Sequence, residues 1–156
     1  MSGIRLGDIP DMKAIVKMAY ELQAESVYYD IKSDEQIFKT LVAGMMGSKL
    51  ARVFVVIDDD DEPQGFLLGL VDNFFFSRER YASDLMVFVR EGYRHLAPKL
   101  FKEFMTWAES KPRVRHITLG LSSGTGDPDR VGRMYENLGL SKVGGIYTKR
   151  IEQCPA

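Results

Sequence analysis

The strongest chemical signal in the sequence is a buried strand that leads through a short basic turn into a helix. Residues 84–89 are apolar after an initial aspartate, and residues 96–110 carry apolar side chains at helical spacing. The first turn of a helix has unpaired N–H groups and the positive end of the helix dipole, which together bind phosphate. Arg90, Arg94 and Lys99 add positive charge beside that turn. The pattern predicts a phosphate-binding turn, and a plain strand-to-helix connection with solvated basic side chains is the alternative.

Other patterns that could carry chemistry are weaker. Gly124, Gly126 and Gly132 do not have the Gly-x-Gly-x-x-Gly spacing of a dinucleotide-binding loop. The aspartates at residues 58–61 lack the glycine and the terminal glutamate of a calcium loop, so we expect a solvated hairpin turn there. Cys154 is the single cysteine and there are two histidines, which leaves too few ligands for a zinc site. We therefore expect no metal ion.

Length and composition indicate one ordinary globular domain over residues 1–156. Hydrophobic residues make up 45% of the chain and charged residues 28%, which is typical of soluble domains. The net charge of −1 argues against a nucleic-acid partner. No apolar run is long enough to cross a membrane, and the N-terminal residues do not have the pattern of a signal peptide. We expect a protein without membrane contact and with a cytoplasmic location.

The helices that must position the basic turn follow from apolar spacing. A helix is predicted over residues 9–25, and Ser33 with Gln36 forms a capping box for the next one. The strongest helix spans residues 96–110, and a short one ends at Gly139. The apolar face predicted for the second helix consists of Ile37, Phe38, Leu41 and Met45.

The predicted strands are short and rich in β-branched residues. After the last helix, Val143, Ile146 and Tyr147 predict one or two closing strands. Because helices and strands alternate irregularly, the order favours an α/β or α+β domain with a mixed sheet. The other strands are predicted over residues 4–6, 53–57, 65–71, 81–89 and 117–121.

A second informative stretch lies near the end of the chain. Residues 132–140 read Gly-Arg-Met-Tyr-Glu-Asn-Leu-Gly-Leu, and residues 143–149 read Val-Gly-Gly-Ile-Tyr-Thr-Lys. They are similar to the Tyr-Glu-x-Leu-Gly-Phe helix end and the closing Val-Gly strand of the GNAT acyltransferase superfamily. The Trp107 and Ala108 pair resembles the GNAT proteins of tailed phages. The residues that fit the acetyl-CoA pyrophosphate loop of that superfamily are Val89, Tyr93, Arg94, Ala97 and Leu100.

The resemblance implies a single GNAT-like domain with a mixed central sheet of about six or seven strands flanked by about four helices. The sheet would open between the strands at residues 84–89 and 116–121. Acetyl-CoA would be the co-substrate, and the protein would transfer its acetyl group directly to a primary amine. The residues that the resemblance assigns to acetyl-CoA are Met86, Val87, Phe88, Val89, Arg94, His95, Leu96, Ala97 and Lys99.

The resemblance also implies catalytic roles. Tyr135 falls on the tyrosine that usually protonates the departing CoA thiolate, and a phenol with a pKa of about 10 can donate a proton at neutral pH. A core tyrosine bonded to a backbone carbonyl is the alternative. Asp84 is the candidate general base, with Glu91 and Asp72 as the other carboxylates expected near the cleft.

The sequence departs from the superfamily pattern inside the loop. Glu91 and Gly92 replace a Pro-Glu pair, and His95 stands where the first loop glycine belongs. A Cβ atom at that position obstructs close approach of the backbone to a pyrophosphate. The rival hypothesis is therefore a GNAT-fold protein without transferase activity that acts as a binding or structural module. The acceptor, a small-molecule or protein amine, and the oligomeric state are open, with a homodimer as the expectation.

Overall fold

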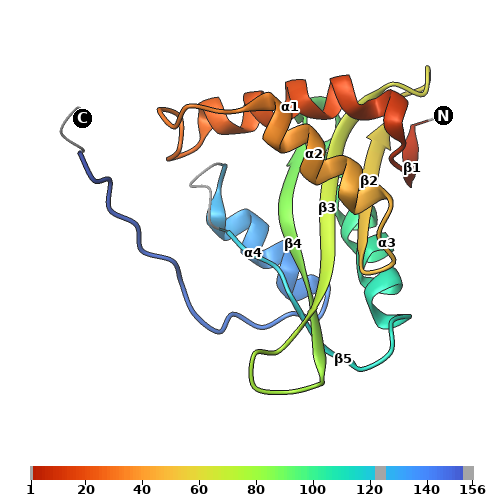
Figure 1. Ribbon diagram of the computed structural model, residues 1–156, viewed down its shortest axis with the longest axis vertical. Helices are drawn as coiled ribbons and strands as arrows, with labels where there is room; N and C mark the ends of the chain where they lie inside the picture. Colours follow the sequence, from red (N-terminus) through yellow and green to blue (C-terminus); the bar gives the residue numbers. More distant parts are fainter. Residues whose placement is uncertain (1, 122–125, 153–156) are drawn as a thin grey trace.

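The computed structural model describes residues 2–121 and 126–152, and Cys154 and the glycine-rich loop residues 122–125 lie outside them. The described strands form one sheet in the order β1-β2-β3-β4-β5 (Figure 1). Neighbouring strands are antiparallel except for β4 and β5, which are parallel. The strands are β1 (Gly3–Leu6), β2 (Ala51–Ile57), β3 (Pro63–Asn73), β4 (Arg80–Val89) and β5 (Val114–Thr118).

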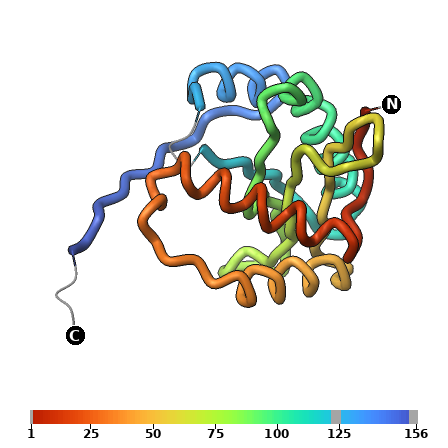
Figure 2. Tube along the Cα trace, turned by 90° about the horizontal axis from the view of Figure 1, so that it is seen from above, coloured from red at the N-terminus to blue at the C-terminus, as the bar shows by residue number. Residues whose placement is uncertain are grey.

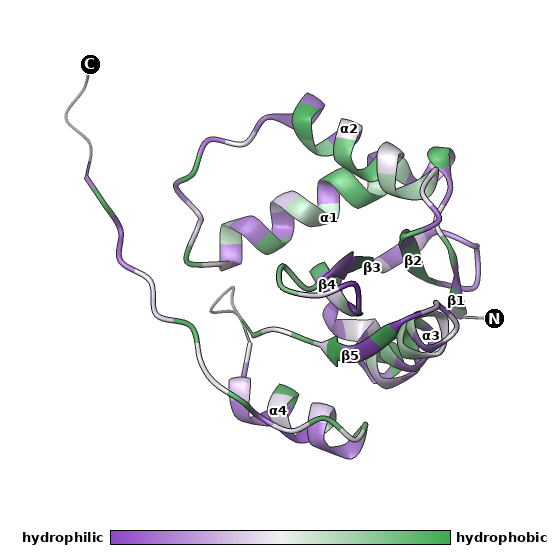
Figure 3. Ribbon diagram, turned by 60° about the horizontal axis from the view of Figure 1, so that its bottom comes forward, coloured by the Kyte–Doolittle hydropathy of each residue, from purple (hydrophilic) through white to green (hydrophobic). Residues whose placement is uncertain are grey.

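Helices cover both faces of this sheet. Figure 3 shows α1 and α2 on one side of the strands and α3 and α4 on the other. Two short 3-10 turns, η1 and η2, lead directly into α1 and α3. The sheet with its two helical layers is the α/β architecture predicted from the sequence. The helical elements are η1 (Ile9–Asp11), α1 (Met12–Glu25), α2 (Glu35–Met46), η2 (Glu91–Leu96), α3 (Ala97–Glu109) and α4 (Pro128–Asn137).

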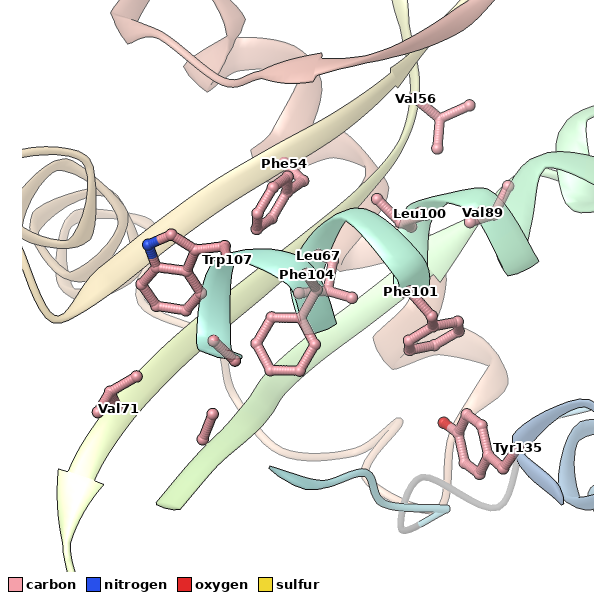
Figure 4. Close-up of a cluster of buried hydrophobic side chains, with 12 residues drawn as sticks. Phe54, Val56, Leu67, Val71, Val89, Leu100, Phe101, Phe104, Trp107 and Tyr135 are labelled. Carbon is pink, nitrogen blue, oxygen red and sulfur yellow. The ribbon is translucent and has the colours of Figure 1, made fainter. Parts of the chain in front are cut away.

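The alternating side chains of the central strands build two separate cores. In β2, Val53 and Val55 pack under α1 and α2, while Phe54 and Val56 pack under α3. All four side chains are buried, as expected for a strand covered on both faces. Figure 4 shows the α3 side of the sheet, where Trp107 and its neighbours on α3 meet the strands.

Most predicted elements are confirmed, and the start of the second helix is a correction. Asp34, not Ser33, is the N-cap of α2, because its carboxylate accepts the backbone N–H groups of Gln36 and Ile37 at 3.0 and 3.2 Å. Asp and Ser are both good caps, so the sequence pattern alone did not separate two adjacent candidates. Gly139 ends α4 as predicted, with a φ of 92° that a glycine adopts without strain.

The closing strands predicted from Val143, Ile146 and Tyr147 are wrong. No strand follows α4 in the described part of the chain, and Val143 and Tyr147 are 95% and 98% exposed. A strand needs a partner and a buried face, and this glycine-containing segment has neither among the described residues. The sheet therefore has five described strands, fewer than the six or seven that were expected.

The segment after α4 runs away from the sheet as an extended chain (Figures 1 and 2). It is tied to the connection between α1 and α2 through Arg150. The guanidinium lies 4.8 Å from the centre of the Tyr29 ring, donates to the Tyr29 hydroxyl and forms an ion pair with Asp30 at 3.1 Å. These contacts are exposed, so they contribute little to stability. No helix in the described ranges is long and apolar enough to cross a membrane.

Candidate active site

The sheet opens along β4. β5 pairs with β4 only from Arg80 to Ser83, and from that point the two strands separate, as predicted. At the same position the register between β3 and β4 shifts, so that Gly69 pairs with Asp84 while Leu68 pairs with Met86. The extra residue between them is a β-bulge, a device that bends a strand and redirects its side chains. The rest of β4 therefore exposes one backbone edge to the space between β4 and β5.

Two polar side chains meet at the point where the strands separate. The Asp84 carboxylate accepts the backbone N–H of Gly120 at 3.1 Å, and the Tyr135 hydroxyl donates to the Gly120 carbonyl oxygen at 3.1 Å. Asp84 comes from β4 and Tyr135 from α4, and Gly120 follows β5. The peptide groups of one residue thus hold both side chains at the same end of the opening.

Packing orients the Tyr135 ring. The ring is 8% exposed and stands edge-on to Phe101 of α3, with ring centres 5.3 Å apart (Figure 4). The backbone of Tyr135 also accepts the N–H of Leu140 just past the helix end. The hydroxyl bond to a carbonyl is the contact expected of a core tyrosine, but here the residue also lines a cleft.

The surroundings of this pair favour the protonated form of each group. Burial raises the pKa of Asp84, against the opposing effect of its backbone hydrogen bond from Gly120. Burial, and then the negative charge of Asp84, raise the pKa of Tyr135 above its ordinary value. A carboxylate with a raised pKa is a better proton acceptor, and a phenol with a raised pKa remains a proton donor at neutral pH.

The opening continues into a cleft of about 1430 Å³. One wall is formed by α1, α2 and their connection, and its side chains are largely apolar. The opposite wall is formed by the start of α3 and by α4, where Arg94, Lys102, Arg130 and Arg133 line the cleft. The ribbon in Figure 3 shows the α1–α2 pair and α4 on opposite sides of β4. The cleft is therefore apolar on one wall and cationic on the other.

The turn after β4 differs from an open phosphate loop. Residues 91–96 form the 3-10 turn η2, which runs without interruption into α3. Its N–H groups are already used inside the turn, since Tyr93 donates to the Arg90 carbonyl at 2.9 Å and Ala97 donates to the Arg94 carbonyl. The Arg94 Nε atom in turn donates to the Val89 carbonyl at 3.3 Å. Anions at this end of the cleft would meet side-chain cations more than backbone donors.

The structure brings most of the predicted site residues to the cleft. Leu96 instead packs against the core under α3, and Lys99 is exposed away from the cleft lining. Asp72 and Glu91, the other carboxylates considered as bases, are exposed and do not line it either. The predicted residues that do line it are Asp84, Met86, Val87, Phe88, Val89, Arg94, His95, Ala97 and Tyr135.

Sequence reasoning missed part of the cationic wall. Lys102, Arg130 and Arg133 complete the cationic wall. The signal for Arg130 and Arg133 was present, because two arginines three residues apart lie just before Tyr135 on the same short helix. From the sequence we expect the pocket walls to come from the first two helices and from residues 72–82. α1 and α2 do line the cleft, whereas residues 72–82 do not.

Comparison with known proteins agrees with this geometry. The sequence matches no family model and no curated protein. Among solved structures, glucosamine-6-phosphate N-acetyltransferase from Arabidopsis thaliana is similar with a TM-score of 0.73 and 14% identity, covering 97% of this chain and 99% of that one. An acetyltransferase from Trypanosoma brucei gives 0.69 and 15%, with coverage of 98% and 100%.

A third similar structure holds a ligand derived from CoA. It is the acetyltransferase AAC(6')-Iy in complex with the bisubstrate analogue CoA-S-monomethyl-acetylneamine, with a TM-score of 0.71, 13% identity and coverage of 99% of both chains. These likenesses extend over nearly the whole chain. The fold is that of the GNAT acetyltransferases, as the sequence resemblance implied.

Proposed function

We propose that the protein is an N-acetyltransferase that moves an acetyl group from acetyl-CoA to a primary amine by direct transfer. The observation that carries the proposal is the convergence of Asp84 and Tyr135 on Gly120, at the point where β4 and β5 separate. A proton acceptor and a proton donor, both with raised pKa values, line a cleft that runs along a strand edge. Amine acylation needs both groups.

The donor would lie along the exposed edge of β4. Backbone groups of residues 86–89 line the cleft there and can pair with the amide groups of pantetheine as a further strand would. The phosphates would meet Arg94 and His95 at the start of α3, and Arg130 and Arg133 on α4. Charge-assisted hydrogen bonds from such side chains can replace the backbone donors that η2 uses internally.

The reaction in this site would run as follows. Asp84 takes a proton from the acceptor ammonium, and the resulting amine nitrogen attacks the thioester carbonyl carbon. The new C–N bond forms as the C–S bond breaks, and Tyr135 gives its proton to the leaving sulfur. The nitrogen then loses its second proton to solvent, and the proton held by Asp84 passes through solvent to restore Tyr135. The products are the N-acetyl amine, the CoA thiol and one released proton. Much of the rate comes from holding amine and thioester together.

A second candidate function rests on η2. Its internally paired N–H groups do not form the backbone cradle that binds a pyrophosphate in an open glycine loop. This observation favours a GNAT-fold protein that binds a partner without transferring an acetyl group. The cytoplasmic location, the homodimer and the similarity to phage proteins also remain proposals, as does the choice between a small-molecule and a protein acceptor.

A thermal-shift titration with acetyl-CoA separates the two functions. For the transferase, a ligand concentration of 100 times the Kd stabilises the folded state by about 2.7 kcal/mol. Incubation with acetyl-CoA and a panel of amines, followed by thiol release, then tests transfer. The absence of any shift with millimolar acetyl-CoA or other acyl-CoA esters would exclude the transferase and leave the binding module.

A further inference from the structure

The apolar wall of the cleft consists of side chains that the core does not use. Ile37 and Leu41 lie one turn apart on α2 and are 70% and 43% exposed, although the sequence pattern placed both in the core. Only Val42 and Met45 of α2 are buried. From α1 and the connection that follows it, Tyr20, Tyr28 and Ile31 add further exposed apolar surface to the same cleft.

This surface is positioned as a binding wall. The side chains that hold α1 and α2 to the sheet, such as Ile15, Met18 and Val42, are fully buried beneath it, so fold stability does not require the exposed set. Apolar side chains gathered inside a concave cleft are typical of a ligand site. They leave water only when a ligand with an apolar surface is bound.

Most of the acidic side chains on this wall already have a hydrogen-bond or ion-pair partner. Asp34 caps α2, and Glu35 forms an ion pair with Lys39 at 3.1 Å. Lys32 also lines the wall, and Glu25 is its one carboxylate with no partner among the described residues. An acceptor with several positive charges would need several uncommitted carboxylates here. The strong positive charge lies on the opposite wall, where phosphates would bind.

We propose that the acceptor is a primary amine carried on an apolar body, which packs on the α1–α2 wall. The proposal rests on the proposed acetyl transfer. The ammonium end faces Asp84, which removes its proton, and the apolar body displaces water from Ile37, Leu41 and Tyr20. As in the proposed reaction, the C–N bond forms as the C–S bond breaks, which gives an N-acetyl amine and the CoA thiol.

The first test compares three amine probes at fixed acetyl-CoA: 2-phenylethylamine, ethanolamine and spermidine. Thiol release gives kcat and KM for each. We expect 2-phenylethylamine to have a KM at least about tenfold below the other two, since its ring buries apolar area on the wall. A KM for ethanolamine or spermidine equal to or below that of 2-phenylethylamine overturns the proposal.

The second test uses variants that do not alter the core. Because Ile37 and Leu41 are exposed, Ile37→Ser and Leu41→Ser should fold normally, which the melting temperature checks. Each should raise the KM for 2-phenylethylamine by about threefold to tenfold, and by more than it changes the KM for ethanolamine. Phe75→Ser is the matched control, because Phe75 is 99% exposed outside the cleft. Equal effects of the three variants overturn the proposal.

A calorimetric titration of the protein alone with 2-phenylethylamine keeps this proposal separate from the proposed function. Binding that Ile37→Ser weakens and Phe75→Ser does not supports the apolar site even where acetyl-CoA fails to bind. Binding that is absent, or equal in wild type and Ile37→Ser, overturns the site even where acetyl-CoA binds.

Discussion

The two halves of β4 both have β3 as a neighbour, but they differ in whether β5 lies along the other edge. Both halves pair with β3, but only residues 80–83 pair with β5, and the half that follows Asp84 borders the cleft. In the first half the strand has a paired neighbour along both edges. In the second half the pairing with β3 alone keeps the strand in place, so the other edge is available to a ligand. Because the pairing with β3 keeps this half of β4 rigid, its other edge can remain unpaired.

The largest expected effect tests whether the polar groups beside the open half do chemistry. Tyr135→Phe keeps the ring that packs on Phe101 and removes the proton donor. We expect turnover to fall by about 10²–10⁴-fold, the usual contribution of general acid catalysis, with the Kd for acetyl-CoA unchanged. The melting temperature should change little, because exposed Gly120 can bind water instead. Full turnover in this variant would assign thiolate protonation to water.

The next prediction tests the core packing that holds β3, the strand with which both halves of β4 pair. Phe104 is fully buried against β3 at the level of the bulge, and a Cβ atom added to Gly69 would lie 2.6 Å from its ring. Phe104→Ala should lower the free energy of unfolding by about 3–5 kcal/mol, because it leaves a cavity in tightly packed core. Urea unfolding measures the change, with Phe75→Ala as the exposed control. A decrease in the free energy of unfolding as small as that of Phe75→Ala would mean that neighbouring side chains fill the space left by the Phe104 ring.

Arg94 tests the cationic end of the open half. Arg94→Ala should weaken acetyl-CoA binding by about 1.5–3 kcal/mol, the value of one charge-assisted hydrogen bond. Lys99→Ala is the matched control, because Lys99 is equally exposed on the following turn but lies away from the cleft. Calorimetric titration should show the loss only for Arg94→Ala. Equal losses in both variants would indicate a diffuse electrostatic attraction in place of a defined contact.

The smallest effect concerns the pH dependence of stability. Because burial raises the pKa of Asp84 above its ordinary value, the folded protein holds this proton at pH values where the unfolded chain has lost it. The contribution of Asp84 to stability is therefore complete below that value and falls as the pH rises through the folded pKa.

Asp84→Asn removes this titrating carboxyl. We expect the free energy of unfolding of the wild type, minus that of the variant, to decrease as the pH rises above the ordinary range of an aspartate pKa. Asp11 and Glu21, whose pKa values are lowered by Arg5 and Arg90, act in the opposite direction but are common to both proteins. Urea unfolding at several pH values measures the difference. A difference that rises with pH would mean that Asp84 is stabilised as a carboxylate.

The sequence predicted the elements whose signals are local. The helix over residues 9–25, the hairpin around residues 58–61 and the strong helix over residues 96–110 all have short-range patterns, and the structure confirms them. The placement of Tyr135 beside the cleft followed from the resemblance. The cap at Asp34 was missed by one residue, because two good capping residues are adjacent.

The remaining features depend on long-range contacts. The apolar periodicity predicted Ile37 and Leu41 on one face of a helix. Only the tertiary structure decides whether such a face packs against the core or lines a cleft. The apolar residues after Gly139 have a strand pattern without a partner in the described chain. Gly120 joins Asp84 and Tyr135 through its backbone, and a backbone contact has no sequence signature.

The strand order has a consequence for how the chain folds. β2, β3 and β4 are joined by short connections, whereas β1 reaches β2 only after α1 and α2, and β5 reaches β4 only after η2 and α3. Strands joined by short connections have low contact order and pair early, while pairings across helices close longer loops and form late. During synthesis at about 5–20 residues per second, the four-stranded part leaves the ribosome before Gly120 and Tyr135 do. The β2–β4 part of the sheet thus serves as the template on which the β5 side of the cleft, with Gly120 and Tyr135, is completed last.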